Sequence, residues 1–362
     1  MITRSTDVVL LLGAGASVEA GIPAAAKMIQ LIEEALLEDS EWKPFTDLYN
    51  HVKSAIYYSA GLKGEFGGGV TFNIETLVNT LYELEKNEEH PLYPFIASWN
   101  SRFVDLATRD FCKIREFRRL ILKVLQTWMC PEDTAKAEYY NGLINLQQAL
   151  NYPLHIFTLN YDLCVERINR NGFSVETGFA DNGPNHFWDW ERFEPSDTGS
   201  ALLPQIYLYK LHGSINWKRD GAKNLFSVEQ IQSVDPDKMD IIFGRDFKLE
   251  AADPYLFYAY QFRRYTLESR LIVIVGFGFA DDHINKILSQ ALNRSKNKRL
   301  LVVSNLTSDV EKDQMHSRVY NALGVPEEQI VILGDSAKDF MKRSDLPSIL
   351  MEQIPQDTEV PF

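Results

Sequence analysis

The chain of 362 residues has few cysteines, and they are not spaced as metal ligands. Cys112, Cys130 and Cys164 include no Cys-x-x-Cys pair, and three thiolates cannot complete a four-cysteine zinc site. An odd and sparse cysteine count is typical of a reducing compartment rather than of a disulfide-stabilised fold. We therefore expect no zinc, no other bound metal and no disulfide framework.

Long hydrophobic runs are also missing. The longest, at residues 8–12 and 271–275, fall well short of the roughly 20 apolar residues that cross a membrane. Residues 1–7 lead directly into the first of these runs without the pattern of a cleavable signal peptide. These features predict a cytoplasmic protein that does not contact a membrane.

The chain has fewer basic than acidic residues. Lysine and arginine total 37, and aspartate and glutamate total 50, which gives a net charge of −13. A protein that binds a nucleic-acid backbone needs a clustered basic surface, so direct nucleic-acid binding is not expected. A helix N-terminus can still bind a phosphate in a protein that is acidic overall. With 45% hydrophobic residues, the composition is that of a globular protein with a sizeable core.

Strand-like runs occur at the start of the chain and again in its second half, with a long helical pattern between them. Helical stretches at 73–87, 103–129 and 135–150 carry apolar residues at three- and four-residue spacing. The strand-like runs lie at residues 8–12, 154–159, 206–211, 240–243, 271–275, 299–304 and 329–333. The first strand needs partners that the helical stretch cannot supply.

This pattern predicts an α/β fold, a Rossmann-like, doubly wound parallel sheet with an inserted helical module. We expect residues 1–40 and 151–350 to form the Rossmann-like domain, residues 41–150 the helical module, and residues 351–362 a C-terminal tail.

A glycine-rich turn follows the first predicted strand directly. Small residues let a backbone approach a pyrophosphate closely, and a following helix directs free N–H groups at the anion. No Gly-Lys-Ser/Thr follows, which excludes a P-loop, and Val18 stands where Gly-x-Gly-x-x-Gly has its third glycine. The alternative is a tight turn without a ligand. The candidate pyrophosphate-binding residues are Gly13, Ala14, Gly15, Ala16 and Ser17.

Polar side chains also follow the strand at 154–159. Asn160 and Asp162 stand where the chain leaves the core, and in open α/β sheets the carboxyl ends of the strands are where ligands bind. Alternatively, Asp162 caps the following helix and Asn160 forms a turn.

A histidine follows the next strand. His212, with Gly213 and Ser214 after it, places an imidazole at the same predicted edge. A single histidine is more often structural than catalytic. Here, however, polar residues such as Asn160 and Asp162 follow a neighbouring strand at the same predicted edge.

A further glycine pair follows the strand at 271–275. Gly276 and Gly278 permit close approach of a ligand, or they form a plain tight turn. Asp281 or Asp282 is expected to cap the next helix.

Ser304 and Asn305 end the strand at 299–304 and are suited to a ribose or adenine edge, although an ordinary strand exit would look the same. Each of the five signals is weak alone. Together they point to one cleft, because parallel strands share their carboxyl edge.

In order and rough placement, these motifs resemble those of the sirtuin (silent information regulator two) family of NAD-consuming enzymes. Gly13-Ala-Gly-Ala-Ser17 with Gly21-Ile-Pro23 resembles the family's phosphate loop, and Thr158-Leu-Asn-Tyr-Asp162 its Thr-Gln-Asn-x-Asp motif. Leu211-His-Gly-Ser214 resembles the catalytic Leu-His-Gly-Ser, and Ile242-Phe-Gly244 is similar to the Phe-Phe-Gly-Glu of the substrate strand.

Three departures separate this chain from the deacylases of that family. Ala24-Ala25-Ala26 replaces Asp-Phe-Arg after Gly-Ile-Pro, Arg245 replaces the glutamate, and the four-cysteine zinc module is missing. The chain therefore resembles the bacterial antiphage branch, whose members hydrolyse NAD+ and are paired with a sensor. The resemblance implies NAD+ as substrate, a separate partner such as a HerA-type ATPase or a short Argonaute, and a homo-oligomer.

The resemblance also implies roles. Asn160 would hold the nicotinamide ribose or a water, Asp162 would orient Asn160 or stabilise the developing cation, and His212 would be the general base. The glycine-rich turn would bind the pyrophosphate, and Gly276, Ser304 and Asn305 would line the adenosine end. Gly213, Ser214 and Gly278 are further candidate NAD-binding residues. The alternatives are an NAD-dependent deacylase or ADP-ribosyltransferase, and a non-catalytic subunit that senses NAD or ADP-ribose.

Overall fold

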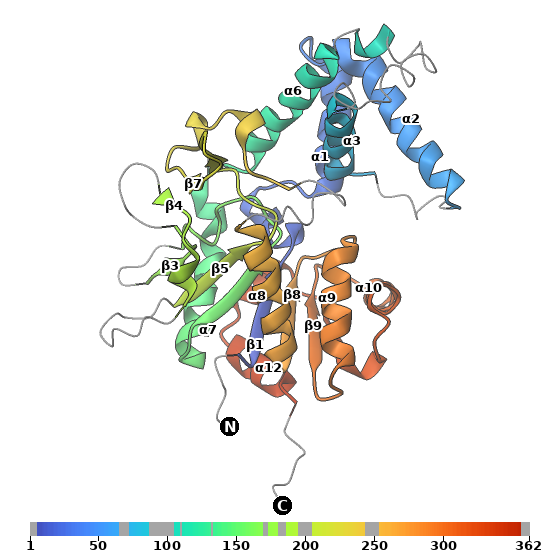
Figure 1. Cartoon of the computed structure of the whole chain (residues 1–362). Coiled ribbons are helices and arrows are strands. Elements are labelled where there is room, and N and C mark those ends of the chain that lie inside the picture. The colour runs from blue at the N-terminus through green and yellow to red at the C-terminus, as the bar shows by residue number, and fades with distance from the viewer. Residues whose placement is uncertain are drawn as a thin grey trace, which may run out of the picture. The chain divides into compact units, whose positions relative to one another are not determined.

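The computed structural model describes residues 6–64, 72–86, 105–108, 111–131, 133–168, 173–179, 186–194, 205–242 and 253–355. The chain forms two compact units, Met1–Ile22 with Met129–Phe362 and Pro23–Trp128. We call the first the sheet unit and the second the helical unit, and Figure 1 shows their elements.

A seven-stranded parallel sheet is the centre of the sheet unit, with the strand order β10-β9-β8-β1-β2-β5-β3. This confirms the predicted Rossmann-like parallel sheet. Residues 240–242, the described part of the run at 240–243, add no strand to it, because Ile241 makes an isolated antiparallel bridge with Gly213. The strands are β1 (Val8–Leu12), β2 (Leu154–Thr158), β3 (Val175–Glu176), β5 (Ile206–Lys210), β8 (Leu271–Val275), β9 (Arg299–Val303) and β10 (Ile330–Leu333).

Helices flank this sheet. Helices α8 and α9 contact each other, as do α9 and α10, and their side chains join one core with alternate strand residues such as Leu11, Phe157 and Ile274. The intervening strand residues are buried as well, so both faces of the sheet are covered, as a parallel sheet requires. The helices are α7 (Gly142–Leu150), α8 (Tyr255–Glu268), α9 (Asp282–Asn293), α10 (Asp309–Leu323), α11 (Ala337–Lys342) and α12 (Leu346–Gln353).

Short elements complete the sheet unit. A small antiparallel sheet has the order β4-β7-β6. Its strands are β4 (His186–Phe187), β6 (Trp217–Arg219) and β7 (Leu225–Ser227), and the 3-10 segments are η1 (Ala14–Ala20), η5 (Thr134–Asn141), η6 (Trp190–Phe193), η7 (Ile231–Ser233), η8 (Pro236–Lys238) and η9 (Glu327–Gln329).

The helical unit packs around aromatic side chains. The ring of Phe117 stacks on Phe45 with centroids 5.1 Å apart, and Trp42 and Tyr49 meet it edge-on. Its elements are α1 (Ala25–Glu38), η2 (Lys43–Phe45), α2 (Thr46–Leu62), α3 (Ile74–Lys86) and α6 (Cys112–Trp128).

The boundaries of the two units differ from those expected at 40/41 and 150/151. Helix α1 belongs to the helical unit because it packs against η2 and α3. Segment η5 and helix α7 belong to the sheet unit because they pack against α11, and α7 also against α12. Helix α12 continues to Gln353, so the first residues of the expected tail are helical, and residues 356–362 lie outside the described part.

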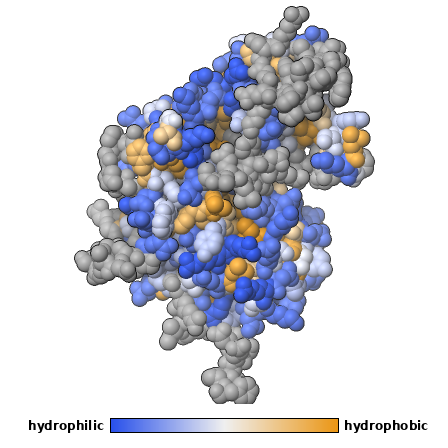
Figure 2. Space-filling view, viewed as in Figure 1, coloured by the Kyte–Doolittle hydropathy of each residue, from blue (hydrophilic) through white to orange (hydrophobic). Residues whose placement is uncertain are grey.

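None of the helices described above has both the length and the hydrophobicity that membrane crossing requires. Hydrophilic residues prevail on the face of the molecule that Figure 2 shows, with small hydrophobic patches between them. This surface agrees with the net charge of −13.

A buried histidine lies within the sheet on β2. The ring of His155 stacks on Tyr265 with centroids 3.8 Å apart and on Tyr207 at 5.2 Å, and its Nδ1 lies 3.2 Å from the hydroxyl of Tyr209. Burial, with a smaller contribution from the positive charge of Arg264, lowers the pKa of His155 to about 3. The native ring is therefore neutral above that pH.

This histidine should make folding sensitive to acid. Below about pH 6.5 the imidazole takes up a proton in the unfolded chain but not in the native one, so stability falls as the pH drops from about 6.5 toward 3. Between pH 7 and 5 the loss should reach about 2 kcal/mol. His155→Phe keeps the stacked ring and should remove that part of the dependence in urea unfolding, whereas His316→Phe on α10 should keep it. Equal slopes in the two variants would contradict this account.

Candidate functional site

The five predicted polar segments follow five strands that are neighbours in the sheet, β9, β8, β1, β2 and β5. Since these strands are parallel, their carboxyl ends share one edge of the sheet. The chain leaves β1 toward β2 on one side and reaches β8 on the other, so the strand order reverses at β1. This topological switch point is where open α/β sheets bind ligands.

The glycine-rich turn after β1 packs against the turn after β8. The N–H of Gly13 donates to the carbonyl of Val275 at 2.9 Å, and that of Gly15 to the carbonyl of Gly276 at 2.8 Å. A Cβ on Gly13 would lie 2.6 Å from the Cα of Phe277, and one on Gly15 would lie 2.8 Å from the Cα of Gly276. Gly13 and Gly15 are therefore required because the turn after β1 and the turn after β8 are in direct contact. Within Gly13–Ser17, Ala14 is the exposed residue.

Ser17 is the centre of a buried polar cluster that joins β1 to β2. Its hydroxyl donates to Asp162 Oδ2 at 2.7 Å and accepts from Asn160 Nδ2 at 3.0 Å. The hydroxyl of Tyr140, from η5, lies 2.9 Å from the same oxygen. We call Ser17, Asn160, Asp162 and Tyr140 the Ser17 cluster. The serine hydroxyl expected to face a pyrophosphate is instead fully buried and engaged within the protein.

Asp162 holds the chain after β2 in place. Its second carboxylate oxygen accepts from the N–H of Cys164 at 2.9 Å, which forms a turn. The alternative that Asp162 caps a following helix is wrong, because residues 163–168 form turns and no helix. Asp162 is buried and reaches Asn160 through Ser17. This geometry favours the orienting role over direct contact with a cation.

Lys210, the last residue of β5, is a buried charge that the sequence analysis did not single out as a site residue. Its ammonium donates to the carbonyl of Asp162 and to Glu166 Oε1, the latter at 2.8 Å. It therefore ties the segment after β2 to the strand that leads to His212. Lys210 could have been identified from the sequence, because a lysine at the end of an otherwise apolar strand is unusual.

His212 pairs with the residue that begins α9. Its Nε2 lies 3.3 Å from Asp281 Oδ2, while Asp281 Oδ1 caps the helix by accepting from the N–H groups of His283 and Ile284. The prediction that Asp281 or Asp282 caps this helix is thus confirmed for Asp281. Its second role as the partner of His212 could not be read from the sequence, because the two residues lie on loops after different strands.

The other ring nitrogen of His212 is available for chemistry. Nδ1 is buried and has no hydrogen-bond partner among the described residues. A proton on Nε2, beside the Asp281 carboxylate, leaves the lone pair of the neutral ring on Nδ1. Asp281 therefore lies where it can orient the imidazole ring of His212.

Gly213 and Ser214 hold the turn that follows His212. Gly213 has φ +84°, and a Cβ there would lie 2.1 Å from the carbonyl oxygen of Asp240. Ser214 is buried, and its hydroxyl donates to the carbonyl of Tyr161 at 3.3 Å. Both residues thus bond within the protein, and their predicted ligand contacts remain predictions.

Gly276 and Gly278 differ in how much space surrounds their Cα atoms. Gly276 has φ +68°, and a Cβ there would lie 2.2 Å from the amide nitrogen of Ala16, whereas a Cβ on Gly278 would meet nothing within 4 Å. Beyond β9, Ser304 is half-buried, and Asn305 is exposed. Of these four residues, Gly278 and Asn305 are exposed.

Two predicted features fall wholly or partly outside the described residues. In the motif Ile242-Phe-Gly244 and the following Arg245, the described part ends at Ile242, whose carbonyl accepts from the hydroxyl of Tyr161 at 3.0 Å.

Within the described residues, no group of three or more histidine, cysteine, aspartate or glutamate side chains could hold a metal. Burial raises the pKa of Cys164, so that its thiol is neutral.

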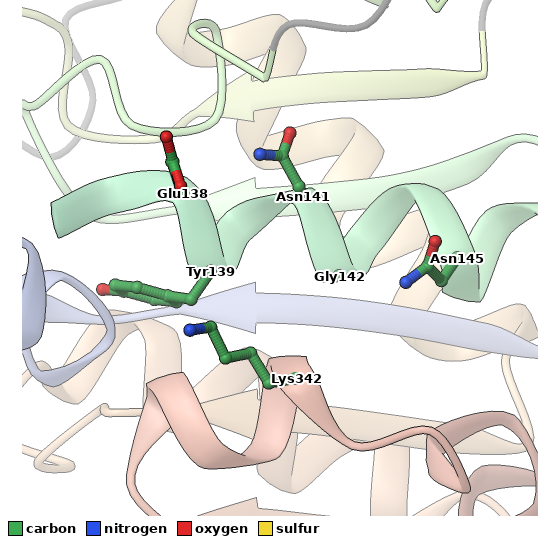
Figure 3. Close-up of a pocket in the computed structure, with 6 residues that line it drawn as sticks. All are labelled: Glu138, Tyr139, Asn141, Gly142, Asn145 and Lys342. Carbon is green, nitrogen blue, oxygen red and sulfur yellow. The ribbon is translucent and has the colours of Figure 1, made fainter. Parts of the chain in front are cut away.

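A surface cavity of about 260 Å³ is lined by none of the predicted site residues. Figure 3 shows η5, α7 and α11 around it, with Lys342 of α11 beneath Tyr139. Its lining residues are Glu138, Tyr139, Asn141, Gly142, Asn145 and Lys342. Since Glu138, Asn145 and Lys342 are exposed, it is an open hollow and not the predicted cleft.

Residues 154–325 match the family of SIR2-like domains. The matched segment contains Asn160, Asp162 and His212, and β1 with its glycine-rich turn precedes it. None of the curated protein sequences matches the chain.

Solved structures of Sir2 proteins are similar to the chain over nearly its whole length. A Sir2 homologue in complex with NAD is 13% identical, with a TM-score of 0.44, over 98% of this chain and 92% of that one. A mutant Sir2 homologue in complex with 2'-O-acetyl ADP-ribose is 13% identical, with a TM-score of 0.45, over 99% and 97%. A Sir2 protein bound to a propionylated peptide is 11% identical, with a TM-score of 0.40, over 96% and 95%. The fold assignment rests on the strand order described above.

Proposed function

We propose that this protein, whose residues 154–325 match SIR2-like domains, hydrolyses NAD+ to nicotinamide and ADP-ribose. The observation that carries the proposal is the placement of the Ser17 cluster and the His212–Asp281 pair on neighbouring strands at the switch point of the sheet. This arrangement offers a buried amide and carboxylate beside an oriented imidazole.

In the reaction, the bond between the ribose carbon and the nicotinamide nitrogen breaks, and its electron pair leaves with nicotinamide. Positive charge develops on the ribose, as in glycoside hydrolysis. The oxygen of a water molecule then bonds to that carbon and gives up a proton. His212 takes this proton, or that of a ribose hydroxyl, at the nitrogen that Asp281 leaves unpaired.

Asn160 positions the ribose or the attacking water. Its amide nitrogen is fixed by Ser17, which Asp162 in turn holds, so the carbonyl end of the amide has a defined direction. An oxygen placed in advance beside a developing positive charge stabilises it without reorganisation. Asp162 is therefore a positioning residue in this mechanism.

The remaining predicted contacts belong to the two ends of the dinucleotide. The turn Gly13–Ser17, with Gly213 and Ser214, lies on the pyrophosphate side, and its exposed Ala14 can approach an anion through the backbone. The adenosine end lies along Gly276, Gly278, Ser304 and Asn305. The open space around Gly278 fits a bulky ligand there.

Deacylation is the competing activity. The same fold family includes a protein solved with a propionylated peptide, and a deacylase would use the same NAD+ side of the site. Against it stand Ala24-Ala25-Ala26 in place of Asp-Phe-Arg and the three cysteines of the chain. A deacylase or ADP-ribosyltransferase would require an acylated peptide or an acceptor protein, whereas hydrolysis requires only NAD+ and water.

The biological role we propose is that of the effector of a bacterial antiphage defence system that depletes NAD+ in the cytoplasm. An enzyme of this kind must be restrained in the uninfected cell, so we expect a homo-oligomer controlled by a separate sensor, a HerA-type ATPase or a short Argonaute.

The test is to incubate the full chain with NAD+, with and without an acylated peptide, and to follow nicotinamide and ADP-ribose. Equal release of both products without peptide supports hydrolysis. Release that depends on the peptide supports deacylation, and NAD+ binding without turnover, alone and with the purified partner, supports a sensing subunit.

A further inference from the structure

Two adjacent tyrosines outside the predicted motifs reach the glycine-rich turn. Tyr139 and Tyr140 end segment η5, and both are almost completely buried. Their rings stack with centroids 4.7 Å apart. They lie more than 120 positions from the turn in the sequence, within the stretch at 135–150 whose spacing predicts a helix.

Both hydroxyl groups converge on one carbonyl of the turn. Tyr139 donates to the carbonyl oxygen of Ala16 at 2.5 Å, and Tyr140 approaches the same oxygen at 2.9 Å. Tyr140 also lies 2.9 Å from the hydroxyl of Ser17, whereas among the described residues no hydrogen bond joins Tyr139 to that serine. The two tyrosines therefore hold the same peptide group of the turn, that between Ala16 and Ser17, while β8 and the residue after it hold Gly13 and Gly15.

The chemistry of the pair suits a permanent donor role. Burial raises the pKa of both phenols well above their ordinary value of 10, so neither ionises at physiological pH. A buried hydroxyl that bonds a carbonyl fixes the backbone more firmly than a solvent-exposed one, because no water competes for the bond.

We propose that Tyr139 and Tyr140 are positioning residues for the NAD+ reaction, with distinct effects. Tyr139 acts on the turn alone and so sets how tightly the pyrophosphate binds. Tyr140 also touches Ser17, which fixes Asn160, and so sets the geometry of the reacting ribose as well. This inference rests on the proposed NAD+ hydrolysis.

The experiment compares Tyr139→Phe, Tyr140→Phe and Tyr152→Phe, each of which removes one hydroxyl and keeps the ring. Tyr152 is the matched control, because its buried hydroxyl has no hydrogen-bond partner among the described residues. For nicotinamide release we expect Tyr139→Phe to raise KM about tenfold with kcat little changed, and Tyr140→Phe to lower kcat about tenfold as well. Tyr152→Phe should match the wild type in both.

Hydrogen exchange of the segment Ala14–Ala20 gives a readout that does not require NAD+. It should be faster in Tyr139→Phe and Tyr140→Phe than in Tyr152→Phe. If the wild type neither binds nor cleaves NAD+, the proposed function fails, and exchange alone shows whether the tyrosines hold the turn. If the wild type cleaves NAD+ but both variants keep the kcat and KM of Tyr152→Phe, the positioning role is wrong.

Discussion

Replacing His212 with alanine is expected to lower the rate of nicotinamide release from NAD+ by about 100- to 10,000-fold, the usual contribution of a general base. Binding of NAD+ should change much less than the rate, because most of the proposed dinucleotide contacts lie on the turns after β1, β8 and β9, away from the imidazole. Calorimetric titration with NAD+ and a single-turnover assay of nicotinamide release measure the two separately.

The partner of the histidine can be tested without removing the helix cap. Asparagine caps helices about as well as aspartate, so Asp281→Asn keeps the cap of α9 while it removes the charge beside His212. We expect a loss of about tenfold in kcat with an unchanged melting temperature. His316→Ala on α10 is the histidine control. A His212→Ala protein that cleaves NAD+ at the wild-type rate would remove His212 from the mechanism.

The second large effect is expected from Gly276→Ala. Alanine at φ +68° costs about 1 kcal/mol, and its Cβ would lie 2.2 Å from the amide nitrogen of Ala16, so the two turns must separate. We expect a total loss of more than about 3 kcal/mol of stability, and a fall in melting temperature on the order of 10 °C.

Gly278→Ala is the matched control, two residues further along the same turn. A Cβ there meets nothing within 4 Å, so the melting temperature should stay near that of the wild type. If Gly278 lines the adenosine end, this variant should weaken NAD+ binding instead. Equal melting temperatures for the two variants would contradict the packing role assigned to Gly276.

Much of the sheet could be predicted from the sequence. Five-residue apolar runs such as Val8–Leu12 and Leu271–Val275 form its central strands, because only a strand covered on both faces buries every side chain. The position of the polar segments after these strands followed from the same pattern. The boundaries of the helical unit did not, because α1 and α7 have similar helical patterns and differ only in what they pack against.

The sequence by itself predicted the strands, and their alternation with helices predicted a parallel sheet with Asn160 and His212 at its carboxyl edge, since both patterns follow from the order of residues along the chain. Only the tertiary structure decided that Ser17 bonds to Asp162, that Gly276 is required by Ala16, that Asp281 orients His212, and that Tyr139 and Tyr140 hold the glycine-rich turn. Each of these contacts joins segments far apart in the chain. A hydrogen bond or a close approach of that kind depends on where the folded backbone brings two groups together, and no local spacing of residues encodes it.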